Sequence, residues 1–172
     1  FLLRVLLPLA RELGAAKVVA LLNRLVSEFD AVAIRYGLEK IKTIGDAYMA
    51  AGGLPVPSVD HTERMVRMAQ EMLEIIARVR AETGLRLHVR VGIASGPVMA
   101  GIIGRNKFSY DVWGDTVNLA SRLESQSQPG RILVCPSCRQ RLDGRFQFES
   151  MGTLQIKGIG ACEAWFVTGT KT

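Results

Sequence analysis

The most informative segment of this chain is FSYDVWGDTVNLASR, residues 108–122. Residues 110–113 form a short segment that leads through a glycine into a helix, which we expect to begin at about Asp115. In that helix Asn118 and Arg122 stand four residues apart and share one face. An amide and a guanidinium in this arrangement can bind the charge that develops on a phosphate, whereas a solvated polar stripe on a surface helix would give the same pattern.

A second polar cluster lies upstream, in EKIKTIGDAYM, residues 39–49. The pattern predicts two short strands joined by a tight turn at residues 44–47. Because side chains alternate along a strand, Lys40 and Lys42 should share one face. Asp46 falls in the turn, where a carboxylate can hold Mg²⁺ against a substrate phosphate. A Gly-Asp turn with two solvated lysines is the alternative explanation of the same residues.

The remaining pattern predicts an α+β fold. Apolar spacing predicts long helices over residues 11–36 and from Ser58 or Asp60 to a glycine stop at Gly84. Strands are expected at residues 85–94, 98–103 and 132–134, a short helix at 136–142, and edge strands in the tail at 146–148, 154–157 and 164–167. We therefore expect residues 1–172 to form a single domain, with helices packed on one face of a mainly antiparallel sheet.

Charge narrows the class of partner. The formal net charge is +6, which favours nucleic acid, an acidic membrane surface or a polyphosphate. The sequence lacks aromatic residues interleaved with basic ones on a sheet face, and it lacks a helix-turn-helix pattern, so we expect no nucleic-acid partner.

Cysteine usage indicates the compartment. The chain has three cysteines, an odd number without a dense framework, which favours a reducing environment and a cytoplasmic catalytic domain. Two of them form CPSC, residues 135–138, which resembles a redox motif at a helix start, but no second pair is present to complete a zinc site. The apolar opening at residues 1–7 is too short for a membrane span, which needs about 20 residues.

Taken together, the two polar clusters resemble the catalytic domain of the class III adenylate and guanylate cyclases. The matching stretches are residues 38–52, 90–104, 110–124 and 156–160. The resemblance implies a ferredoxin-like βαββαβ fold and a homodimer whose sites are shared between protomers. It implies conversion of ATP to 3′,5′-cyclic AMP and pyrophosphate with Mg²⁺ or Mn²⁺, two ions being expected. A membrane anchor or regulatory domain in a longer protein is compatible with it.

The resemblance assigns base recognition to Lys42 and Asp111. A lysine donor and an aspartate acceptor suit the ring nitrogen and the exocyclic amine of adenine. The guanylate branch of the family typically has Glu at the first position and Cys or a similar residue at the second. The pair therefore implies ATP rather than GTP, because the wrong base would leave polar groups unmatched.

The other family roles fall on four residues. Asn118 matches the residue that orients the ribose, and Arg122 matches the one that stabilises charge at the α-phosphate. Lys157 matches the lysine that contacts the terminal phosphates, although an exposed lysine in a glycine-flanked turn would look the same. Asp46 matches one of the two metal-binding aspartates.

The first strand departs from the family pattern. Relatives typically read FADIVGFT there, and its Asp is the second metal ligand. This chain has FLLRVLLPLA, residues 1–10, with no carboxylate before Glu12. The segment is altered, or the true first strand is absent, or residues are missing. One carboxylate instead of two should weaken divalent binding, so we expect low activity. A catalytically weak or silent dimerisation or regulatory domain is the alternative function.

Overall fold

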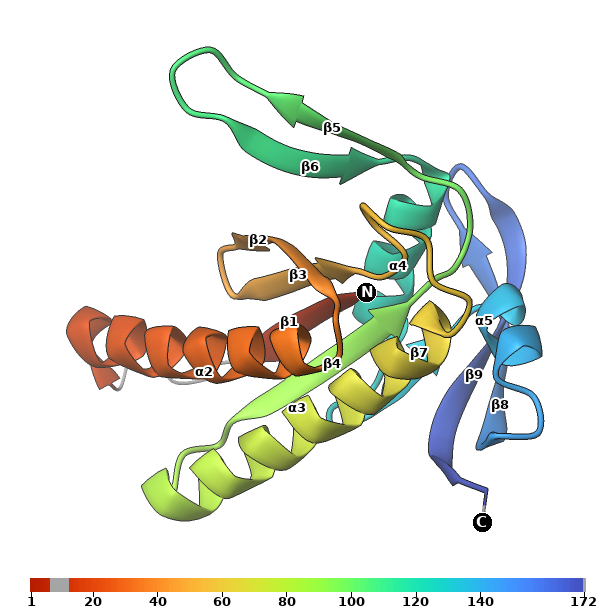
Figure 1. Cartoon of the computed structure of the whole chain (residues 1–172). Coiled ribbons are helices and arrows are strands. Elements are labelled where there is room, and N and C mark those ends of the chain that lie inside the picture. Colours follow the sequence, from red (N-terminus) through yellow and green to blue (C-terminus); the bar gives the residue numbers. More distant parts are fainter. Residues whose placement is uncertain (7–12, 172) are drawn as a thin grey trace.

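The computed structural model describes residues 1–6 and 13–171. The elements are, in chain order, β1 (Leu2–Leu6), α2 (Ala15–Arg35), β2 (Glu39–Ile44), β3 (Ala47–Ala51), α3 (His61–Thr83), β4 (His88–Ile93), β5 (Met99–Ile103), β6 (Ser109–Trp113), α4 (Asp115–Gln126), β7 (Ile132–Val134), α5 (Pro136–Arg141), β8 (Phe146–Ile156) and β9 (Gly160–Thr170) (Figure 1). Gly84 ends α3 in the left-handed conformation, as predicted. The predicted start of the first helix at Arg11 lies outside the described residues.

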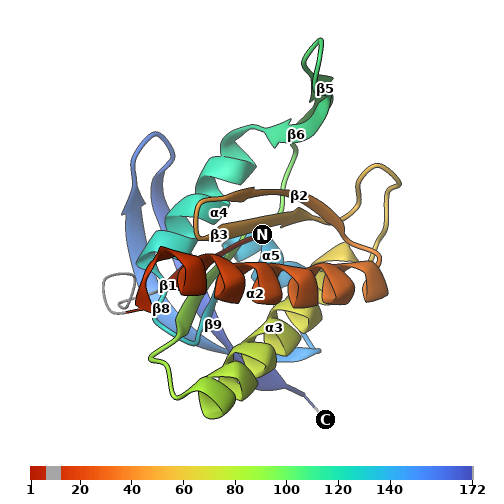
Figure 2. The same ribbon diagram turned by 90° about the vertical axis from the view of Figure 1, so that its left-hand side faces the viewer.

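Seven strands form the main sheet, in the order β2-β3-β1-β4-β7-β9-β8. The pair β4–β7 is parallel and the other neighbours are antiparallel. From β1 to β4 the chain order is βαββαβ, so the predicted ferredoxin-like α+β fold is confirmed. Strands β5 and β6 form a separate hairpin that projects from the body as an arm (Figures 1 and 2).

The first residues of the chain form strand β1. Residues Leu2–Leu6 lie in the sheet between β3 and β4, with Leu2 opposite Gly92 and Arg4 opposite Arg90. Residues 2–6 thus form a central strand of the sheet, and this strand carries no carboxylate. Residues 7–10 of the same segment lie outside the described residues.

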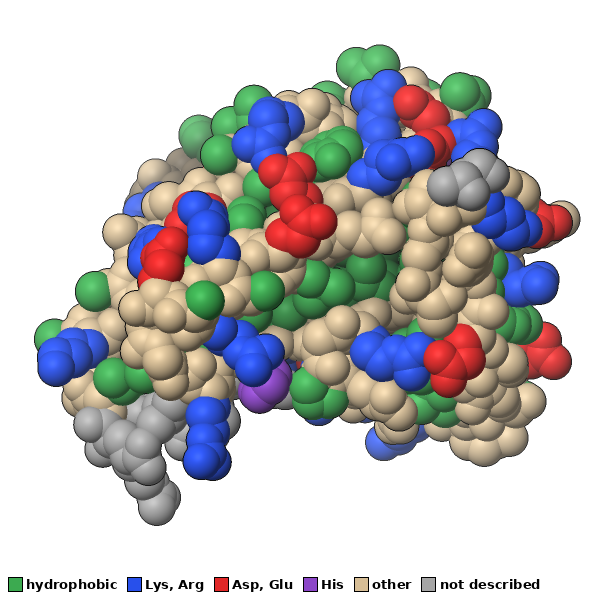
Figure 3. All heavy atoms as spheres, turned by 90° about the horizontal axis from the view of Figure 1, so that it is seen from below, with side chains coloured by type: hydrophobic (Ala, Val, Ile, Leu, Met, Phe, Trp, Pro, Cys, Tyr) green, Lys and Arg blue, Asp and Glu red, His purple; other side chains and the backbone are tan. Residues whose placement is uncertain are grey.

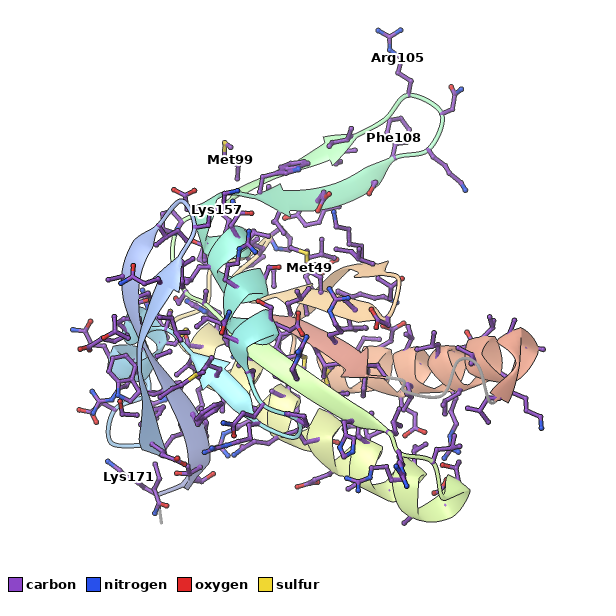
Figure 4. All side chains as sticks on the ribbon, turned by 180° about the vertical axis from the view of Figure 1, so that it is seen from behind. Met49, Met99, Arg105, Phe108, Lys157 and Lys171 are labelled. Carbon is purple, nitrogen blue, oxygen red and sulfur yellow. The ribbon has the colours of Figure 1, made fainter. Side chains whose placement is uncertain are left out.

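The helices cover both faces of the sheet. The two long helices, α2 and α3, lie together on one face, as predicted, whereas the shorter α4 covers the other face (Figures 1 and 4). Met68 and Met72 of α3 are fully buried against Val89 and Val91 of β4, which belong to the same core. These residues give α3 an apolar stripe at helical spacing that matches the alternating apolar face of the strand.

Ion pairs tie the two long helices together. Arg24 of α2 pairs with Glu82 of α3, and Arg78 of α3 pairs with Glu28 of α2. Arg35 of α2 also pairs with Glu71 of α3. Figure 3 shows Lys and Arg side chains lying beside Asp and Glu side chains on the face seen from below. Positive charge on that face is therefore interrupted by acidic residues.

Two local predictions were wrong. Lys40 and Lys42 do not share a face, because a β-bulge lies between them and reverses the alternation. Lys40 reaches Asp30 on α2 at 2.8 Å, while Lys42 reaches Asp111 on β6. The tail forms two long strands joined as a hairpin, and β9 lies inside the sheet between β7 and β8 instead of at an edge.

The closest approach between layers is at Gly92 of β4. A Cβ atom added there would lie 2.2 Å from the backbone N of Glu124 and 2.4 Å from the carbonyl O of Ala120. Both atoms belong to the backbone of α4 and cannot move aside as a side-chain tip would. Glycine at this position thus sets the distance between α4 and the sheet.

Gly92→Ala should force α4 away from β4 and lower the free energy of unfolding by about 3 kcal/mol. The matched control is Gly101→Ala on the arm, where the nearest atom to an added Cβ lies 3.7 Å away, and its change should stay within about 0.5 kcal/mol. Thermal denaturation followed by circular dichroism measures both. Equal stability of the two variants would show that α4 does not depend on this contact.

Candidate active site

Lys42 and Asp111 meet, although 69 positions separate them in the chain. Lys42 Nζ donates to Asp111 Oδ2 at 2.6 Å, and the backbone N–H of Val112 donates to Asp111 Oδ1 at 2.8 Å. The ammonium of Lys42 is the main cause that holds the pKa of Asp111 below its ordinary value. Asp111 is therefore a carboxylate at neutral pH, which can accept hydrogen bonds from a ligand as well.

Two features bring this pair together. The bulge between Lys40 and Lys42 turns Lys42 away from the α2 side of the sheet. The arm then brings β6 close to β2, so that Asp111 faces Lys42 (Figure 1). The Lys42 side chain is 39% exposed and that of Asp111 is 13% exposed, so the pair has one accessible side for a ligand.

Asn118 and Arg122 lie on α4, one turn apart, and both are exposed. Asn118 also lines a cavity of about 260 Å³ with Leu2, Met49 and Val112. Lys157 is exposed in the turn between β8 and β9, at the end of the molecule where the arm leaves the body (Figure 4).

Asp46 lies where predicted, in the turn between β2 and β3, but it has an unexpected partner. Arg4 NH1 of β1 donates to Asp46 Oδ1 at 2.8 Å. Arg4 Nε also donates to Glu124 Oε2 of α4 at 3.3 Å. The guanidinium thus connects the turn to the helix that carries Asn118.

Glu124 is the centre of this cluster. Its side chain is 1% exposed, and its other oxygen, Oε1, accepts from Arg90 NH2 at 2.9 Å. Arg4 and Arg90 are cross-strand neighbours on β1 and β4, so both guanidinium groups reach the same carboxylate. Sequence reasoning missed this cluster; the available signal was an arginine at position 4 inside an otherwise apolar segment.

The metal ligand that the sequence predicted, Asp46, is paired with Arg4. Mg²⁺ has about six oxygen ligands, of which protein carboxylates usually supply one or two, while waters and substrate phosphates supply the others. Leu2, Met49 and Val112 form a small apolar cluster at the neighbouring positions and supply no side-chain oxygen. Within residues 1–6 and 13–171, no group of three His, Cys, Asp or Glu side chains is placed to hold a metal ion. In the part of the chain that the structure describes, Asp46 is present as predicted, but a guanidinium occupies its Oδ1.

Cys135 and Cys138 of the CPSC motif are free thiols in the core. A hydrogen bond from Cys138 lowers the pKa of Cys135 to about 5, and burial together with that bond raises the pKa of Cys138. Cys135 is 1% exposed and Cys138 is 0% exposed, so neither thiol is accessible to a redox partner at the surface.

Similarity to known proteins identifies the family. Residues 8–169 match the family model described as the adenylate and guanylate cyclase catalytic domain. This chain belongs to that family. Strand β1, with Arg4, precedes the matched residues, in accordance with its departure from the family pattern. Members of the family use divalent metal ions.

Relatives of both substrate classes are similar to this chain. An adenylate cyclase of Mycobacterium tuberculosis is 41% identical over 162 residues, which cover 94% of this chain and 37% of that protein. A membrane guanylyl cyclase of Dictyostelium discoideum is 38% identical over 95% of this chain and 11% of its own length. The chain therefore spans little more than a third of the first relative and a smaller share of the second.

Solved structures show the same architecture. The guanylate cyclase domain of RhGC from Catenaria anguillulae, in complex with GTP, has a TM-score of 0.91 and 34% identity over 99% of this chain and 96% of its own. The adenylyl cyclase CyaB of P. aeruginosa has a TM-score of 0.92 and 26% identity over 99% of this chain and 92% of its own.

Among the described helices, none has the length and apolar character needed to cross a bilayer.

Glu124→Gln should lower the free energy of unfolding by about 3 kcal/mol, because it leaves two guanidinium groups without their buried counter-charge. Glu149→Gln is the matched control, since Glu149 pairs with Arg131 at the surface and its side chain is 58% exposed. That control should change the free energy by less than about 1 kcal/mol. Urea denaturation measures both, and similar losses in the two variants would argue against a central role for Glu124.

Proposed function

We propose that this domain converts ATP to 3′,5′-cyclic AMP and pyrophosphate. The observation that supports ATP is the contact between Lys42 and Asp111. The ammonium can donate to N1 of adenine, and the carboxylate can accept from its exocyclic amine. Guanine has an N–H at N1 and a carbonyl at C6. Its N1–H donor would face the ammonium of Lys42, and its carbonyl acceptor would face the carboxylate of Asp111, so neither hydrogen bond could form. The likeness to a mycobacterial adenylate cyclase favours the same substrate.

In the proposed reaction the ribose 3′-oxygen attacks the α-phosphorus, loses its proton, and displaces pyrophosphate. Little covalent work falls to the protein, so positioning and charge stabilisation dominate. We assign Asn118 to orienting the ribose, Arg122 to the charge on the α-phosphate, and Lys157 to the terminal phosphates. All three side chains are exposed, which leaves their polar groups available to a ligand.

We propose that the chain forms a homodimer and that each nucleotide site is shared between its two copies. The arm exposes large apolar side chains: Met99 is 69% exposed, Ile102 71% and Phe108 77%. Figure 4 shows Phe108 and Arg105 near the tip of the arm, away from the body. Such a concentration of exposed apolar groups on a projecting hairpin is typical of a protein interface. A homodimer would cover the arm and bring residues of two protomers to one nucleotide.

A second candidate function has its own support. The pairing of Asp46 with Arg4 removes a carboxylate that relatives are expected to use for metal. A domain that keeps Lys42 and Asp111 but has Asp46 paired with Arg4 could bind ATP and turn it over very slowly. It would then act as a regulatory module. Retained ATP binding without cyclic AMP formation would select this function.

The double variant Lys42→Glu with Asp111→Cys should shift preference from ATP toward GTP, because it exchanges donor and acceptor at the base. Formation of cyclic AMP and cyclic GMP from each nucleotide, together with nucleotide binding, measures the change, which should exceed about tenfold in the ratio. Lys17→Gln, at an exposed position on α2, is the charge-matched control and should leave the ratio unaltered. A double variant that still selects ATP would show that the base is recognised elsewhere.

Phe108→Ser should weaken self-association by about tenfold, since an exposed aromatic anchor of the arm is removed. Sedimentation velocity over a concentration series, with ATP present, measures it. Val59→Ser is the control, because Val59 is 98% exposed but lies in the loop before α3. A wild-type chain that stays monomeric at every concentration would contradict the shared site.

A further inference from the structure

Asp46 faces a positive charge that belongs to the chain itself. Its carboxylate accepts from Arg4 NH1 at 2.8 Å. The backbone holds the two segments together, because Val5 N donates to the carbonyl O of Asp46 at 2.9 Å. Arg4 is thus delivered to Asp46 by strand pairing, and any cation that binds this carboxylate must displace the guanidinium.

Arg4 is also anchored on its other side. Its Nε donates to Glu124 at 3.3 Å, and the side chain of Glu124 is almost completely buried. Arg90 lies at 2.9 Å from the other oxygen of Glu124. The two carboxylates and the two guanidinium groups sum to zero charge. A divalent ion would therefore enter a cluster that is already neutral, beside two fixed positive charges that repel it.

We propose that the guanidinium of Arg4 takes the place of a divalent cation at Asp46, and that this domain binds the triphosphate of its nucleotide without Mg²⁺ or Mn²⁺. This inference rests on the proposed nucleotide site. A guanidinium carries five N–H donors, and the contacts with Asp46 and Glu124 use two of them. The Arg4 side chain is 37% exposed, so its remaining donors can bind phosphate oxygens.

The first test measures the binding of 3′-deoxy-ATP, which lacks the attacking hydroxyl and cannot be cyclised. Isothermal titration calorimetry is carried out with the intact chain, once in EDTA and once in Mn²⁺. We expect the two dissociation constants to agree within about twofold. Binding that is tenfold or more weaker in EDTA would overturn the inference.

The second test uses Arg4→Ala. This variant should bind 3′-deoxy-ATP at least tenfold more weakly in EDTA, and Mn²⁺ should restore much of the affinity, because Asp46 and Glu124 then face a vacated position. Arg24→Ala is the matched control, since Arg24 also bridges two glutamates, Glu28 and Glu82, but on the outer surface of α2 and α3. The control should bind like the wild type in both buffers.

Arg4→Lys is a second variant that keeps the test decisive if Arg4→Ala does not fold. It keeps one positive charge at Asp46, and its binding of 3′-deoxy-ATP should remain insensitive to Mn²⁺. Circular dichroism of each variant establishes that it is folded. A folded Arg4→Ala protein that binds as the wild type does in EDTA, or a folded Arg4→Lys protein whose binding depends on Mn²⁺, would contradict a role of Arg4 in holding the triphosphate.

A titration of Mn²⁺ alone, followed by electron paramagnetic resonance, separates this inference from the proposed function. The wild type should leave Mn²⁺ free, whereas Arg4→Ala should bind it. Bound Mn²⁺ in the wild type that is lost in Asp46→Asn would overturn the inference even if ATP binds. Conversely, a wild type that binds neither Mn²⁺ nor 3′-deoxy-ATP would retain the blocked cation site while refuting the proposed nucleotide site.

Discussion

The arrangement of this domain depends on the contact between helix α4 and the central strands β1 and β4. Gly92 allows the helix backbone to approach the sheet closely, and Glu124 is buried at that point between Arg4 and Arg90. A buried carboxylate requires paired charges, since desolvation without them is expensive. This requirement fixes the register between α4 and the sheet. It thereby fixes the direction in which Asn118 and Arg122, one turn apart, face the solvent.

The pair Lys42 and Asp111, to which we assign base recognition, is held by different means. The β-bulge in β2 turns Lys42 out of the strand alternation, and the β5–β6 arm supplies Asp111. The bulge lies in β2 of the ferredoxin-like unit, whereas the β5–β6 arm follows β4 and lies outside that unit. The proposed nucleotide site would thus combine the sheet and helix α4 with a projecting hairpin whose apolar residues are exposed.

The first strand shows how one strand can serve the core with one face and carry a charged residue on the other. Leu3 and Val5 point into the main core and keep β1 in the centre of the sheet. On the opposite face, Leu2 packs in an apolar cluster and Arg4 pairs with Asp46. The core residues satisfy the packing requirement, whereas the residues on the α4 face carry the charges from which the role of Arg4 is proposed.

The sequence by itself determined the family, the α+β class, most element positions and the candidate residues, because these follow from local periodicity, glycine stops and contiguous motifs. It also predicted that Lys42 and Asp111 act together. It did not reveal the bulge after Lys40, the interior position of β9, or the partners of Arg4. These depend on which strands pair and in which register, and that choice is made by contacts between residues far apart in the chain. Only the tertiary structure could therefore show that the carboxylate expected to bind metal already holds an arginine.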